Sequence, residues 1–128
     1  MKTLAVALSL LATGCSGSLA GPSAVLGPEE IAVWARLMTD LGAAGMDGAD
    51  PVNLRGLRLV VGGTREEAHS NDHMIQVPAP IDPRLLRHEM AHFFCEKTLG
   101  HGCANPGNTV AGHRWKTPSG RDLWEIVD

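Results

Sequence analysis

The chain has no tyrosine, no internal repeat, no excess of basic residues and only three cysteines in 128 residues. The absence of a repeat excludes repeat architectures. The net charge is −3 and no basic stripe is present, which argues against nucleic acid as a partner. No second long apolar segment follows the first 12 residues. The composition is that of one small domain behind a short N-terminal segment.

The first 15 residues carry the features of an export signal. Met1-Lys2 gives a short positive start, and Leu4 to Ala12 is an apolar run too short to span a bilayer. It ends in Leu11-Ala12-Thr13-Gly14-Cys15, which resembles the lipobox of bacterial lipoproteins. The resemblance implies cleavage before Cys15 and acylation of that cysteine. The alternative is an ordinary signal peptide in which Cys15 is incidental.

The domain division follows from this resemblance. Residues 1–14 are predicted to be a lipoprotein signal peptide, 15–27 a lipidated cysteine with a flexible tether, and 28–128 a single domain. The resemblance implies a lipid anchor and a location in the bacterial cell envelope. Ser16 after the cysteine, rather than aspartate, favours sorting to the outer membrane in lipoproteins of this kind. We expect a monomer attached to the membrane through its lipid.

Helical and strand patterns alternate after residue 27. Pro28 with two glutamates predicts a helix start, helical spacing of apolar residues follows, and Gly45 can end that helix. Leu57–Val61 and Met74–Val77 are predicted strands, separated by a polar loop from Thr64 to His73. The fold class is therefore α+β, with a small sheet of two to four strands.

A second helix and an irregular C-terminal segment complete the prediction. Asp82-Pro83 supplies an N-cap and a first-turn proline, and the helix runs to about Leu99 before Gly100. From His101 onward the chain is rich in loop-forming residues. The pattern of Arg121–Val127 fits either a closing strand or a short helix.

The second predicted helix carries the sequence His88-Glu89-Met90-Ala91-His92, an H-E-x-x-H motif. Two imidazoles four residues apart lie on one helical face and can reach one metal ion. The glutamate beside the first histidine can then act as general base. The motif predicts a Zn²⁺ site with His88 and His92 as ligands and Glu89 as the catalytic residue.

The motif and the order of elements around it resemble the minimal zincin metallopeptidases. In that family the strand before the motif helix lies at the edge of the cleft and binds an extended substrate. The resemblance assigns this role to Met74–Val77, through main-chain groups. It implies a peptide or protein substrate.

Zinc in a peptidase needs a third protein ligand and a fourth position for water. Gly112-His113-Arg114-Trp115-Lys116 resembles the downstream ligand segment of SprT-like zincins, which implies His113 as third ligand. His101 is the alternative. Arg114 is a candidate oxyanion donor, since the chain lacks the tyrosine that is one usual donor. The metzincin pattern is excluded, because Cys95 and Thr98 occupy its required positions.

Cys95 and Cys103 remain as an even pair once Cys15 is lipidated, and an exported protein favours a disulfide between them. The alternative is that one of them binds zinc.

These patterns predict a zinc-dependent peptidase in which Glu89 takes a proton from zinc-activated water as the water attacks a peptide carbonyl. Two alternatives remain open: a non-catalytic lipoprotein with a structural metal site, and a vestigial peptidase fold.

Overall fold

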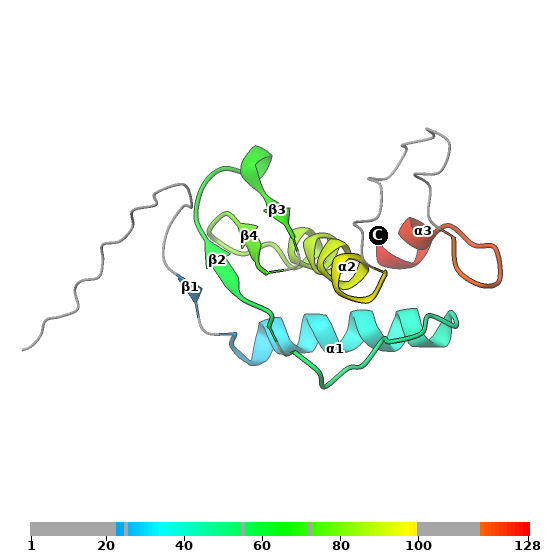
Figure 1. Cartoon of the computed structure of the whole chain (residues 1–128). Helices are drawn as coiled ribbons and strands as arrows, with labels where there is room; N and C mark the ends of the chain where they lie inside the picture. The colour runs from blue at the N-terminus through cyan, green and yellow to red at the C-terminus, as the bar shows by residue number, and fades with distance from the viewer. Residues whose placement is uncertain (1–22, 25, 55, 72, 100–115) are drawn as a thin grey trace, which may run out of the picture.

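The computed structural model describes residues 23–24, 26–54, 56–71, 73–99 and 116–128, which form three α-helices and one four-stranded sheet (Figure 1). The mixed α+β class predicted from the sequence is confirmed. Figure 1 shows the sheet to the left of α2, α3 to its right, and α1 running beneath them. In chain order the elements are β1 (Ser23–Ala24), α1 (Pro28–Ala43), β2 (Leu59–Val61), the 3₁₀ helix η2 (Arg65–Glu67), β3 (His69–Ser70), β4 (Ile75–Val77), α2 (Pro83–Leu99) and α3 (Leu123–Val127).

Helix α1 begins and ends where the sequence signals predict. Pro28 occupies the first helical turn, and the Glu30 carboxylate accepts a hydrogen bond of 2.7 Å from the Gly27 backbone N–H. The helix ends at Ala43, and Gly45 then takes a φ of 86°, a conformation that favours glycine. The buried stripe follows helical spacing and consists of Trp34, Leu37, Met38 and Leu41.

Helix α2 also has its predicted bounds, from Pro83 to Leu99. Its start is stabilised by Asp82, whose carboxylate accepts a 2.9 Å hydrogen bond from the Arg84 backbone N–H. That hydrogen bond, helped by the nearby Arg65 guanidinium, lowers the pKa of Asp82. The inner face of α2 packs against α1 and the sheet through Leu86, Met90, Phe93 and Phe94.

The sheet has the order β1-β2-β4-β3, with β2 and β4 parallel and the other two pairs antiparallel. Leu59 of β2 lies opposite Ile75 of β4. Strand β1 falls within the range 15–27 that the sequence assigns to a tether, and it pairs with β2.

The expected position of Met74–Val77 is wrong, because β4 lies inside the sheet and not at its edge. It pairs with β2 on one side and β3 on the other. Its three residues are all buried, as in a strand covered on both faces.

The turn between β3 and β4 is stabilised by Asn71, whose side chain accepts hydrogen bonds from the His73 and Met74 backbone N–H groups. The segment from Thr64 to His73, predicted to be a polar loop, contains η2 and the edge strand β3.

The described C-terminal residues are more regular than the sequence predicts. Arg121–Val127, left open between strand and helix, forms α3 over Leu123–Val127. Asp122 caps this helix, since its carboxylate accepts a 3.0 Å hydrogen bond from the Trp124 backbone N–H. Leu123, Trp124 and Val127 then enter the core.

Several predictions fall on residues outside the described part of the chain. These concern the signal peptide, the lipidation of Cys15, and the segment that carries His101, Cys103, His113 and Arg114. Cys95 is buried on α2, and its pairing with Cys103 stays a prediction. None of the helices in the described part is both long and apolar enough to cross a bilayer.

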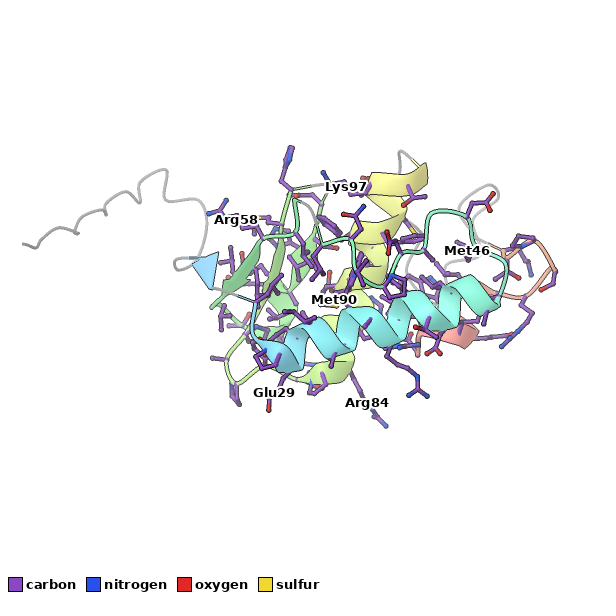
Figure 2. The ribbon with its side chains drawn as sticks, turned by 90° about the horizontal axis from the view of Figure 1, so that it is seen from below. Glu29, Met46, Arg58, Arg84, Met90 and Lys97 are labelled. Carbon is purple, nitrogen blue, oxygen red and sulfur yellow. The ribbon has the colours of Figure 1, made fainter. Side chains whose placement is uncertain are left out.

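Met90→Ala should lower the free energy of unfolding by about 2–5 kcal/mol, because it opens a cavity in a close-packed core. Met90 is 0% exposed and lies near the crossing of α1 and α2 (Figure 2). Val52, which is 85% exposed, provides the control, and Val52→Ala should change the same quantity by no more than about 0.5 kcal/mol. Urea denaturation followed by circular dichroism measures both. Similar losses for the two variants would contradict the described core.

Candidate active site

The two motif histidines lie one helical turn apart on the same face of α2. Their ring centroids are 5.0 Å apart and their planes meet at 69°. A tetrahedral metal ion about 2.0–2.1 Å from one nitrogen of each ring holds two imidazole centroids roughly 5 Å apart. The observed separation therefore fits two ligands of one ion.

Glu89 lies beside this pair and is 6% exposed. No hydrogen bond or ion pair with another described residue engages its carboxylate. Its oxygens are not fully enclosed: among the described residues the buried side-chain polar atom without a hydrogen-bond partner is Ser70 Oγ, so the Glu89 carboxylate meets solvent in the cleft. Glu89 also lines the same cleft as His88. It is thus a nearly buried acid that faces a space where a water molecule or substrate can bind.

Trp124 of α3 covers the two imidazoles. Its ring stacks on His88 at 4.6 Å between centroids with an interplanar angle of 20°, and it meets His92 at 5.0 Å and 55°. The indole is 8% exposed, so it forms a dry wall on this side of the histidines. Trp124 therefore belongs to the hydrophobic core and at the same time packs against both motif histidines.

Asp128 also reaches the site, and the sequence analysis missed it. Its Oδ1 lies 3.5 Å from Nδ1 of His88, within ion-pair distance. The contact places a carboxylate at the Nδ1 side of the ring, so Nε2 is the nitrogen suited to a metal. A carboxylate on the second nitrogen of a metal-binding histidine orients the ring and selects its tautomer. No local sequence pattern predicts this contact, because it joins α2 to a residue 40 positions further along the chain.

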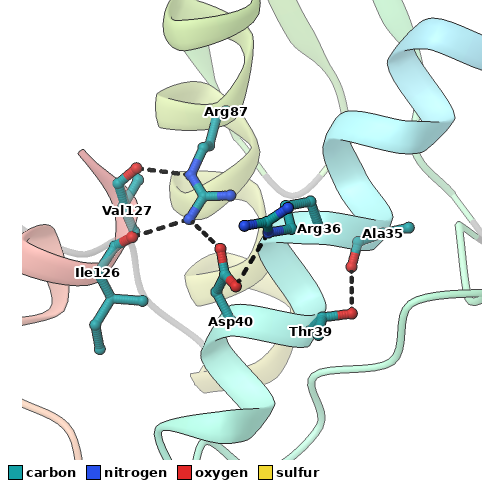
Figure 3. A network of polar contacts seen from close by, with 7 residues as sticks. All are labelled: Ala35, Arg36, Thr39, Asp40, Arg87, Ile126 and Val127. Atoms are coloured by element: carbon teal, nitrogen blue, oxygen red, sulfur yellow. Dashed lines mark hydrogen bonds and ion pairs between the residues drawn. The ribbon is translucent and has the colours of Figure 1, made fainter.

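Arg87, the residue before His88, holds α3 in place (Figure 3). Its Nε donates to the Val127 carbonyl at 2.7 Å, and Nη2 donates to the Ile126 carbonyl at 2.9 Å. Nη2 also forms a 2.8 Å ion pair with Asp40 of α1. The same guanidinium therefore joins all three helices, and it does so next to the first candidate ligand.

An open cleft of about 720 Å³ runs along this region. It extends from η2 and the start of β3, past the N-terminal half of α2, to α1 and the end of α3. The side chains around it include four arginines and three acids as well as a candidate metal ligand. The lining residues are Arg36, Asp40, Arg65, Ala68, Arg84, Leu85, Arg87, His88, Glu89, Ile126, Val127 and Asp128.

Two of the three predicted metal ligands, His88 and His92, lie in the described part of the chain. Within that part, no group of three or more His, Cys, Asp or Glu side chains is close enough to hold a metal ion. The segment 100–115, which lies outside the described part of the chain, carries the predicted third ligand His113, its alternative His101, and Arg114. Their roles stay predictions.

Comparison with protein-family models, curated proteins and solved structures gave no match to this chain. The functional assignment therefore depends on the motif and on the contacts around it.

Arg87→Ala should lower the free energy of unfolding by about 2–3 kcal/mol, since it removes charge-assisted hydrogen bonds to three partly buried groups. Arg36→Ala is the matched control, because Arg36 contacts the same Asp40 at 3.4 Å from an exposed position. That change should amount to less than about 1 kcal/mol. Chemical denaturation of both variants tests the difference, and equal losses would rule out a special role for Arg87.

Proposed function

We propose that the protein is a zinc-dependent peptidase with a minimal zincin-like domain, anchored in the bacterial cell envelope as a lipoprotein. The observation that carries the proposal is the Glu89 carboxylate, nearly buried and without a partner among the described residues, beside two histidines with ligand spacing. A carboxylate that opens into the cleft without a partner can accept a proton from a water molecule bound there. A general base needs this arrangement.

The side chains present suit zinc. Neutral imidazoles are among its preferred ligands, and the 5.0 Å centroid separation agrees with a shared ion. His88 and His92 would hold the metal together with His113, or with His101 in its place. When bound, zinc supplies a Lewis acid that lowers the pKa of water to about 7.

Side chains of the protein would carry out the remaining steps of hydrolysis. Glu89 takes the proton of the attacking water and returns it to the leaving amine. Trp124 excludes solvent from one side of the histidines, and Asp128 orients the His88 ring. Arg114 remains the candidate donor to the developing oxyanion.

Strand β3 takes the place that the sequence analysis gave to Met74–Val77. It is the outer strand next to β4 and contacts α2, and Ala68, just before it, lines the cleft. An extended peptide that pairs with β3 would run along the cleft past His88. The substrate-binding edge therefore precedes the strand expected from the sequence.

A structural metal site is the second candidate function. Trp124 covers both imidazoles, which would also suit a closed site with four protein ligands. The cleft that reaches both His88 and Glu89 favours catalysis over this alternative.

Glu89→Gln should leave the zinc content unchanged and reduce peptide hydrolysis by about 10²–10⁴-fold, because the amide cannot accept the proton. Glu96→Gln is the matched control on the same helix and should retain activity. Zinc content by mass spectrometry and cleavage of a mixture of unstructured peptides are the two measurements. Undiminished hydrolysis by Glu89→Gln refutes the mechanism, and a zinc-loaded parent without hydrolysis supports the structural site.

Asp128→Asn should weaken zinc binding by about 10–100-fold, since the amide no longer stabilises the correct His88 tautomer. Glu125→Gln, in α3 just before Asp128, removes an exposed carboxylate that contacts Arg121, and it should leave zinc affinity unchanged. Competition with a chromogenic chelator measures both affinities. Equal affinities for parent and Asp128→Asn would show that the contact has no orienting role.

A further inference from the structure

The cleft is lined by charges of both signs. Its lining has four arginines against three carboxylates, an excess of one positive charge, whereas the whole chain has a net charge of −3. These four are a large share of the 11 lysines and arginines in the sequence. The charges of the cleft are thus nearly balanced, and a preference for ligands of one sign has to come from a charge that no neighbouring group neutralises.

The four arginines of the cleft differ in their ion pairs and hydrogen bonds with the rest of the protein. Arg36 and Arg87 share the Asp40 carboxylate, and Arg65 forms a 3.3 Å ion pair with Asp82. Arg84 differs, because its guanidinium has no ion pair or hydrogen bond with any described residue. Figure 2 shows its side chain extending away from the body of the protein. Arg84 is therefore the cation in the cleft that is available to a ligand.

The position of Arg84 on α2 relates it directly to the candidate active site. Arg84, His88 and His92 are spaced by four residues and form one stripe along the helix. One turn of helix places Arg84 roughly 6 Å along the axis from His88. An extended peptide advances about 3.3 Å per residue, and alternate side chains point the same way. A substrate side chain two residues from the one at His88 would therefore face Arg84.

We propose that Arg84 binds a carboxylate of the substrate about two residues from the scissile peptide bond, which makes acidic peptides the substrate class of this site. The inference rests on the proposed peptidase function. An Asp or Glu side chain and a C-terminal carboxylate offer the same chemistry to a guanidinium.

The test uses the full-length, zinc-loaded Glu89→Gln protein, so that binding is measured without turnover. The probes are alanine-rich hexapeptides with an amidated C-terminus, in which one position at a time is Glu, Gln or Lys. At one position, calorimetry should show the Glu peptide binding about tenfold more tightly than its Gln counterpart. The same peptides as free acids distinguish recognition of a side chain from recognition of the C-terminus.

Charge reversal separates Arg84 from the general charge of the protein. In the same background Arg84→Glu should reverse the preference, so that the Lys peptide binds more tightly than the Glu peptide. Lys97→Glu makes the same charge change at an exposed position near the other end of α2 and should keep the preference for Glu.

The outcomes also distinguish this inference from the peptidase proposal. Equal binding of Glu and Gln peptides at every position, no measurable binding of any peptide, or an unchanged ranking in Arg84→Glu overturns the inference. An Arg84-dependent preference for acidic peptides supports it, even if the parent protein with Glu89 intact hydrolyses none of them. That last result would refute only the peptidase.

Discussion

The contact of Arg87 with Asp40 and with the carbonyls of Ile126 and Val127 determines the arrangement of the three helices. The Arg87 side chain is only 18% exposed, and a charged group in such a position must have its charge and its donors satisfied, or the fold is destabilised. Asp40 supplies the charge, and the end of α3 supplies two acceptors that have no partner within their own helix. Because such geometry is directional, it specifies where α3 lies as well as adding stability.

The contacts of Arg87 with α1 and with the end of α3 also position the candidate active site. Arg87 precedes His88, so the helix end that it holds lies against the imidazoles. Trp124 then stacks on both rings, and Asp128 reaches the Nδ1 side of the first one. The functional groups are thus carried on a rigid helix and supported by packing, which is the condition for holding ligands in a productive geometry.

The cleft combines two requirements that usually oppose each other. Glu89 is only 6% exposed, yet it lines an open space that is also lined by the guanidinium of Arg84, unpaired among the described residues. The hydrophobic wall contributed by Trp124 lowers the local dielectric, which strengthens every charge interaction in the site. Arg84, His88 and His92 lie at intervals of four residues, so the proposed metal ligands and the proposed substrate-binding cation share one face of α2.

The sequence by itself determined α1, α2 and the H-E-x-x-H face, because caps, helical periodicity and the four-residue spacing are local properties of the chain. It did not determine that β4 is a central strand, since short apolar runs do not reveal how many neighbours they have. The contact of Asp128 with His88 and the contacts of Arg87 with the end of α3 were decided only by the tertiary structure. These contacts join residues about 40 positions apart, and no local pattern encodes which distant groups will meet.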